Sequence, residues 1–328
     1  MSTRTFEDVS DVLILRAIGL GDFLTGVPAY RGLRQKFPQA TITLAAPAVL
    51  EPLARLTGAI DRLLPVNGLG ELTARCASVQ SPSALSPPPG LAVNLHGAGP
   101  ESIRDLLATG AQQIITHRHP QFPLITGPEW CEDMHEVERW TRLLTLEGIP
   151  ADPTALELAK PTQDTIIPDA LIVHPGASAQ ARRWPLNRFA EVARSLAVDH
   201  QVVITGSAAE RPRCLEVAQL AGLHQSCVLA GELDLGELAA LVAAARLVLS
   251  GDTGIAHLAT AYATPSVILF GPTSPRRWGP PAEGPFTVIW RGYTGDPHSR
   301  WVHPALLEIG SDEVLKAAEA RLEDRNLN

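Results

Sequence analysis

The chain has 328 residues, of which 45% are hydrophobic and only 5% aromatic, and its formal net charge of -8 argues against nucleic acid as the main partner. The four cysteines form no close pair, so the sequence indicates neither a disulfide framework nor a zinc knuckle, and a reducing cytoplasm fits best. No stretch approaches the ~20 apolar residues of a membrane span, and the acidic residues before the first apolar run are unlike a signal peptide.

Apolar runs and helical patterns divide the chain into two halves with the same order of elements. In the first half, the run 12–15 predicts a strand, and the turn 16–22 leads from it into a helical pattern that extends to Phe37. Further strands are expected at 41–45, 62–66, 91–95 and 113–116, and helices at 49–57, 102–109 and 133–148. The Ser- and Pro-rich stretch 78–90 predicts a mobile loop.

The turn after the first strand is not a dinucleotide-binding fingerprint, because Phe23 and its neighbour stand where the third glycine is required. The turn instead presents the carboxylate of Asp22 at the end of the strand. The motif alone favours a helix cap and a catalytic group equally for Asp22. Three roles remain open for Arg16: it orients this carboxylate, binds an anionic substrate or lies in solvent.

A linker over 150–168, with four prolines, leads into the second half. Strands are expected there at 171–174, 201–205, 228–229, 247–249 and 267–270, and helices at 186–196, 208–221, 235–245, 256–263 and 312–324. The alternation predicts two parallel sheets, each covered by helices on both faces, with a ligand cleft at the carboxyl ends of their strands. We therefore expect domains at 1–160 and 161–310, and a final helix over 311–328 that packs back on the first domain.

Two glycine-rich turns of the second half are suited to anions. The stretch Ser250-Gly-Asp-Thr-Gly-Ile-Ala-His257 joins a strand to a helix, whose free N–H groups and positive dipole end can face a ligand. The stretch His174-Pro-Gly-Ala-Ser-Ala-Gln-Ala-Arg-Arg-Trp-Pro185 offers a hydroxyl and two arginines, which bind phosphate in a bidentate fork. Each turn alone could equally be a capped helix or an exposed loop, but two of them in one domain suit a diphosphate.

Five short motifs can be read along the chain: Arg16-x-x-Gly-x-Gly-Asp22, His174-Pro-Gly-x-Ser178, Arg182-Arg-Trp-Pro185, Gly206-x-x-x-Glu210 and Gly251-Asp-Thr-Gly-x-x-His257. Together and in this order they resemble glycosyltransferase family 9, which contains the ADP-heptose heptosyltransferases of lipopolysaccharide core assembly. The resemblance covers essentially the whole chain. It implies an α/β fold of the GT-B type, in which two Rossmann-like domains with parallel sheets face each other across a cleft. It also implies inverting sugar transfer without a metal or other cofactor.

The resemblance further implies residue roles. Asp22 matches the general base, and on the acceptor side it is accompanied by Arg16, Gly21 and His96. The donor-binding residues would be Ser178, Arg182, Glu210, Leu233, Asp252, Thr253, Gly254 and His257. Of these, Leu233 falls where the family packs an apolar residue on adenine, although an ordinary core position explains it equally well.

On the acceptor side the chain departs from the lipopolysaccharide enzymes, because Pro100 and Glu101 stand where many of them have a basic residue. This argues against phosphorylated or carboxylated core sugars, so a glycan, a lipid-linked glycan and a small molecule all remain open as acceptors. We expect the donor to be a nucleotide-sugar, with heptose from ADP-heptose favoured, and the protein to be a cytoplasmic monomer, with peripheral membrane association left open. Two alternatives remain: a nucleotide-sugar epimerase of the same fold, and a non-catalytic protein that binds sugar nucleotides.

Overall fold

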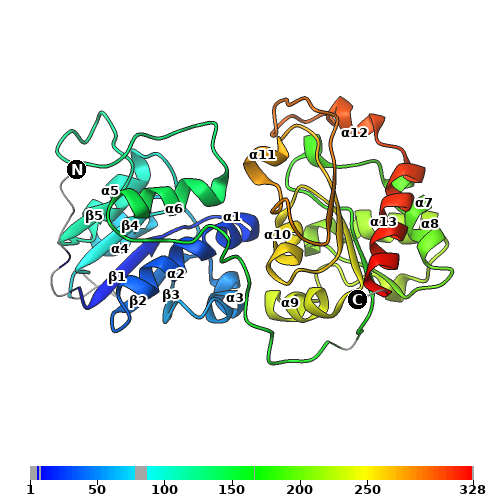
Figure 1. Ribbon diagram of the computed structural model, residues 1–328, viewed down its shortest axis with the longest axis horizontal. Coiled ribbons are helices and arrows are strands. Elements are labelled where there is room, and N and C mark those ends of the chain that lie inside the picture. The colour runs from blue at the N-terminus through cyan, green and yellow to red at the C-terminus, as the bar shows by residue number, and fades with distance from the viewer. Residues whose placement is uncertain (1–5, 7–8, 78–86, 166, 327–328) are drawn as a thin grey trace. The chain divides into compact units, whose positions relative to one another are not determined.

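The computed structural model describes residues 6, 9–77, 87–165 and 167–326 (Figure 1). Two compact units divide the chain, Met1–Ala159 and Lys160–Asn328, and the boundary lies within the linker expected from the sequence. Most of the loop expected over 78–90, namely 78–86, lies outside the described residues. None of the helices in the described ranges is long and apolar enough to cross a membrane.

The first unit is a five-stranded parallel sheet with the order β3-β2-β1-β4-β5. Its strands are β1 (Asp11–Leu15), β2 (Thr41–Ala46), β3 (Arg62–Pro65), β4 (Leu91–Asn94) and β5 (Gln113–Ile115), and its helices are α1 (Leu20–Thr25), α2 (Val27–Lys36), α3 (Glu51–Leu56), α4 (Glu71–Ala77), α5 (Glu101–Ala108) and α6 (Glu136–Leu146). The central strand β1 is buried from Val12 onward. Its unbroken apolar run is typical of a parallel strand that is covered on both faces.

The second unit is also a five-stranded parallel sheet, with the order β10-β9-β8-β6-β7. Its strands are β6 (Leu171–His174), β7 (Val202–Ile204), β8 (Leu247–Gly251), β9 (Ser266–Leu269) and β10 (Phe286–Ile289), and its helices are α7 (Leu186–Leu196), α8 (Arg211–Ala221), α9 (Leu235–Ala244), α10 (Gly254–Ala261), α11 (Pro275–Trp278), α12 (Pro304–Glu308) and α13 (Ser311–Asn326). The strand expected at 228–229 is reduced to a single bridge between Ile204 and Val228.

Each sheet reverses its strand order once, between β1 and β4 in the first unit and between β6 and β8 in the second. Such reversals open a crevice at the carboxyl ends of the two strands, which is where open α/β sheets bind ligands. The loops that follow these four strands carry most of the site residues expected from the sequence.

Helix α13 packs on the sheet of its own unit, and its expected packing on the first domain stays a prediction. Val314, Ala318 and Leu322 recur every four residues, so they form one apolar stripe along the helix. This stripe is buried in the same core as residues of α7, β8 and β9.

Candidate functional site

Asp22 lies in the first turn of α1, in the segment that follows β1. The N-cap of this helix is Gly19, which makes no side-chain capping bond. Asp22 is therefore not the N-cap that the structural interpretation of the sequence suggested, although a carboxylate in the first turn still interacts favourably with the helix dipole. Asp22 and the preceding Gly21 are both partly exposed at this edge of the sheet.

Arg16 is fully buried, so it neither lies in solvent nor offers its charge to an anionic substrate. Its guanidinium donates to the carbonyl oxygens of Asp22 and Leu95, to the hydroxyl of Thr25 at 2.9 Å and to the carboxylate of Glu136 at 3.2 Å. Of the three roles left open by the sequence, orientation of Asp22 is the one compatible with this environment. The orientation acts through the backbone carbonyl of Asp22.

Glu136, at the start of α6, joins Arg16 to a second buried arginine. One carboxylate oxygen accepts from Arg16 and from the indole N–H of Trp140 at 2.8 Å, and the other accepts from Arg139 at 3.1 Å. Burial acts to raise the pKa of Glu136, but the charges of Arg16 and Arg139, with these hydrogen bonds, outweigh it and hold the pKa below its usual value. The group of Arg16, Glu136 and Arg139 could not be recognised in the sequence, because α6 has an ordinary helical pattern and Arg16 is 120 positions from Glu136.

His96 lies in the loop after β4 and is hydrogen-bonded to the loop after β1. The Nδ1 atom of His96 accepts from the backbone N–H of Ala17 at 3.2 Å. The backbone N–H of His96 donates to the side-chain oxygen of Asn94 at 3.1 Å. Burial, together with the charge of Arg16, lowers the pKa of His96 to about 4. The ring is therefore neutral at physiological pH, and the bond at Nδ1 assigns its proton to Nε2.

In the second unit, Arg182 connects the loops after β6 and β8. Its guanidinium donates to the hydroxyl of Ser178 at 2.5 Å and to the carbonyl oxygen of Asp252 at 3.5 Å, and lies 4.0 Å from the carboxylate of Asp252. The side chain of Arg182 is 23% exposed, so its charge remains accessible to a ligand. Three residues from three separate motifs thus meet in one place.

The approach of the two loops depends on Gly251, because a Cβ atom there would lie 3.1 Å from the carbonyl oxygen of Arg182. Thr253 follows as the N-cap of α10 and makes no side-chain capping bond. Gly254 begins the helix. The positive end of the α10 dipole therefore lies beside the guanidinium of Arg182, an arrangement that favours an anion.

Glu210 lies beside the loop after β6, against Gly176. Its carboxylate accepts from the N–H and the hydroxyl of Ser207 at 2.8 Å, as part of a capping box. The same carboxylate lies so close to Gly176 that a Cβ atom at that position would displace it. Although burial acts to raise the pKa of Glu210, its hydrogen bonds to Ser207 outweigh burial and lower that pKa. Burial lowers the pKa of His174 in turn. Glu210 is thus ionised and structurally engaged next to the donor-side loop.

Two expected donor residues are less closely tied to this group. His257, one turn into α10, packs edge-on against Trp278 with ring centroids 6.0 Å apart. Leu233 lines a small cavity of about 160 Å³ together with Leu229 and Leu241. The described residues contain no group of three His, Cys, Asp or Glu side chains that could hold a metal ion.

Two doubly wound units, one with a carboxylate at its strand reversal and one with an arginine and a helix N-terminus, define a protein of the GT-B class. The family model described as "Glycosyltransferase family 9 (heptosyltransferase)" matches residues 130–298, more than half of the chain. The chain belongs to this family and is a glycosyltransferase.

Similarity to individual members extends over nearly the whole chain. Lipopolysaccharide heptosyltransferase 2 of Salmonella typhimurium is 26% identical, over 96% of this chain and 99% of its own length. The structure of Escherichia coli ADP-heptose lipopolysaccharide heptosyltransferase II superposes with a TM-score of 0.79 at 24% identity, covering 96% of this chain and 99% of that one. Escherichia coli heptosyltransferase WaaC, solved with ADP, has a TM-score of 0.70 at 20% identity, with 95% and 99% covered. At these identities the solved structures support the fold.

Proposed function

We propose that this glycosyltransferase transfers a heptose from ADP-heptose to a hydroxyl group of a glycan acceptor, by inverting displacement and without a metal ion. The heptose is supported by the names of the full-length relatives, and the reaction by the residues assembled at the two strand reversals. The four cysteines, which form no close pair, support a reducing cytoplasm.

The observation that carries the proposal is the meeting of Ser178, Arg182 and Asp252 beside the N-terminus of α10. A leaving diphosphate gains negative charge as the glycosidic bond breaks. A guanidinium and a helix N-terminus placed at that point stabilise this charge, and they do so more strongly in the transition state than in the ground state. This is the chemical role that a divalent cation has in many other sugar transfers.

In the proposed reaction, the carboxylate of Asp22 takes the proton from the acceptor hydroxyl as that oxygen attacks the anomeric carbon. Arg16 contributes indirectly. Its bond to the carbonyl of Asp22, and its ties to Leu95 and Glu136, hold the first turn of α1 against β4 and α6. A base that is fixed in this way does not have to be reoriented during each turnover.

The Asp22→Asn variant tests the base. Asparagine keeps the shape but cannot accept the proton at neutral pH, so transfer should fall by about 10²–10⁴-fold while the fold and the affinity for ADP are retained. Transfer rate, ADP affinity and melting temperature are to be measured together. Turnover within a few-fold of the wild type would show that Asp22 is not the base.

A second test concerns the metal. If Arg182 and α10 stabilise the leaving group, treatment with excess EDTA followed by gel filtration should leave the transfer rate unchanged. If EDTA lowers the transfer rate and Mg²⁺ or Mn²⁺, but not Ca²⁺, restores it, metal-free transfer is contradicted. The proposal that the sugar is heptose does not depend on this result.

A further inference from the structure

Three charged side chains, those of Arg16, Glu136 and Arg139, are buried together in the first unit. Their exposed fractions are 0%, 12% and 3%, respectively. Removing charges from water costs free energy, and buried ion pairs are frequently no more stabilising than apolar side chains of similar size. Core stability is therefore a poor reason for two arginines and a carboxylate at this place. The segments that these side chains hold in place provide a better one.

Arg16 holds the backbone of the turn that carries Asp22. Its guanidinium donates to the carbonyl oxygen of Asp22 and to the hydroxyl of Thr25 at 2.9 Å. That hydroxyl donates in turn to the same carbonyl oxygen at 2.9 Å. A further bond goes to the carbonyl of Leu95, in the loop after β4. Because two donors meet at one backbone atom of Asp22, the place of this residue depends on the place of Arg16.

Glu136 and Trp140 fix Arg16 from the side of α6. The Oε1 atom of Glu136 accepts from Arg16 at 3.2 Å and from the indole N–H of Trp140 at 2.8 Å. The guanidinium carbon of Arg16 also lies over the Trp140 ring, 4.9 Å from its centroid. One helix thus offers Arg16 both a carboxylate and an aromatic face. Without the carboxylate, Arg16 would stay charged and buried but would lose its ionic partner, so it would no longer be held in one position.

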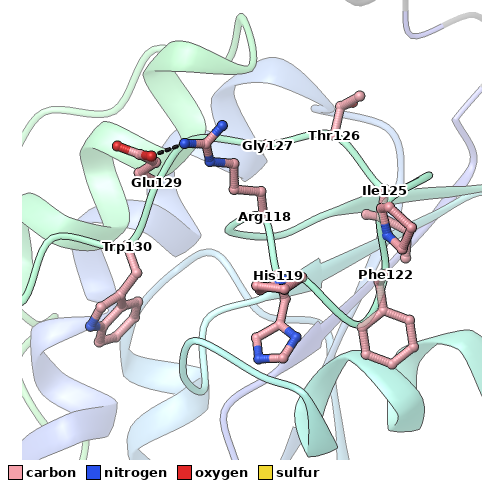
Figure 2. Close-up of a pocket in the computed structure, with 10 residues that line it drawn as sticks. Arg118, His119, Phe122, Ile125, Thr126, Gly127, Glu129 and Trp130 are labelled. Atoms are coloured by element: carbon pink, nitrogen blue, oxygen red, sulfur yellow. Dashed lines mark ion pairs between the residues drawn. The ribbon is translucent and has the colours of Figure 1, made fainter.

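Arg139 attaches Glu136 to the segment between β5 and α6. Its guanidinium donates to the Oε2 atom of Glu136 at 3.1 Å and to three backbone carbonyl oxygens of residues 131–134. It also stacks on Trp130, 4.0 Å from the ring centroid. Figure 2 shows Trp130 at one side of a hollow of about 680 Å³ that this segment encloses. Both oxygens of the Glu136 carboxylate are therefore bound, one on each side of the network.

The segment before Trp130 is itself a closed loop, residues 118–128. The N–H of Arg118 donates to the carbonyl oxygen of Pro128 at 3.0 Å, which joins the two ends of the loop. Gly127 lies so close to the carbonyl oxygen of Thr116 that a Cβ atom would overlap it. Closed loops of this kind hold their own shape. The contacts that end at Asp22 therefore start from a fixed support.

We propose that Glu136 is a positioning residue for the base of the transfer reaction, and that it acts through Arg16 on the backbone carbonyl of Asp22, without contact with a substrate. The inference rests on the proposed function, because it takes Asp22 as the base. Misplacing a reacting group by about 1 Å can slow a reaction by about 100-fold. Loss of Glu136 should therefore lower kcat and leave the affinity for the donor unchanged, since the expected donor residues belong to the second unit.

The variant Glu136→Gln removes the charge and keeps the shape of the side chain. With ADP-heptose and deacylated lipopolysaccharide from an Escherichia coli mutant lacking its heptosyltransferase II, kcat should fall by about 10–100-fold at an unchanged KM for the donor. The decisive comparison is with the double variant Asp22→Asn/Glu136→Gln. It should be no slower than Asp22→Asn alone, because a base that has been removed cannot be misplaced. All rates are measured well below the melting temperature of each variant.

A control and a milder variant complete the design. Asp105→Asn is the matched control, because Asp105 is another buried carboxylate of the first unit and binds residues 70–73. This control should lose stability and keep kcat. Trp140→Phe serves if Glu136→Gln does not fold, since it removes one hydrogen bond from Glu136 but retains the charge and an aromatic ring. It should lower kcat by about tenfold, and have no effect in the Asp22→Asn background.

Three outcomes would overturn the proposal. The first is an unchanged kcat in folded Glu136→Gln or, where that variant does not fold, in Trp140→Phe. The second is an equal fold-reduction with and without Asp22→Asn, because Glu136 would then act independently of the base. The third is a loss of kcat in Asp105→Asn as large as that in Glu136→Gln.

Failure of the proposed function has a different signature, namely that the wild type transfers no heptose from ADP-heptose. Positioning is then measured without turnover, by hydrogen exchange on the full chain. The amides of residues 20–26 should exchange about tenfold faster in Glu136→Gln, or in Trp140→Phe, than in the wild type, and at the wild-type rate in Asp105→Asn. Equal exchange of these amides in the wild type and the variant overturns the proposal.

Discussion

Arg182 shows how one side chain can serve two loops. It spans the ends of β6 and β8 by binding Ser178 and the carbonyl of Asp252, yet remains partly exposed. A guanidinium has several donors in a fixed planar arrangement, so it can hold both loops and still face a diphosphate. In the proposed reaction, structural and chemical roles therefore coincide in Arg182.

Replacement of Arg182 should accordingly affect both binding and rate. In Arg182→Ala, the KM for the donor should rise and kcat should fall, with a combined loss in kcat/KM of roughly 10–100-fold, as expected for one charge-assisted hydrogen bond. Steady-state kinetics with ADP-heptose measure both. Arg211→Ala is the control, because Arg211 is an arginine of the same unit that pairs with Glu232 at 2.8 Å. If kcat and KM of Arg182→Ala are unchanged, as expected for the control, Arg182 does not belong to the donor site.

At the level of single residues, the sequence was informative where a motif is local. Ser178 and Arg182 lie four positions apart and do meet in the structure. The burial of Arg16 could not be predicted, because its partners Leu95 and Glu136 are 79 and 120 positions away. The closed loop 118–128 was missed because it has no repeated pattern, and its shape depends on the bond between Arg118 and Pro128.

At the level of elements, apolar runs predicted every strand that the structure describes except β10, including three-residue strands such as β5 and β7. Strand β10 has four residues and only Ile289 is buried, so it lacks the apolar run by which β1 and β8 are recognised. The helical pattern after Asp22 was read as one helix, but it is divided at Gly26 into α1 and α2. Gly26 lies against the hydroxyl of Tyr30, where a Cβ atom would be only 2.5 Å away.

At the level of the whole molecule, buried histidines make the stability of the first unit depend on pH. His117 is 1% exposed and lies between Trp130 and Trp140. Burial, with the charges of Arg139 and Arg142, lowers the pKa of His117 to about 4. His96 has a similarly low pKa of about 4. In the unfolded chain both rings titrate near their ordinary value of about 6.5.

Between these two values the unfolded state binds more protons than the folded state, so acid favours unfolding. The free energy of unfolding should therefore fall as the pH drops from about 6.5 toward 4, by about 1.4 kcal/mol per pH unit for each such histidine. His117→Asn should remove the contribution of one proton, about 1.4 kcal/mol per pH unit, from this slope. The slope is measured by urea unfolding at several pH values. His298→Asn, at an exposed position, provides the surface control. An unchanged slope in His117→Asn would show that His117 does not remain neutral in the folded protein.

The closed loop 118–128 also bears on how such enzymes can diverge. Because Arg118 and Pro128 are joined at its base, changes in its length do not have to be transmitted to β5 or α6. Doubling the length of a flexible loop costs only about 0.6 kcal/mol of closure entropy. Exchange of this single segment between family members therefore offers a route by which the surface of the first unit can diverge, or be engineered, while both sheets are inherited unchanged.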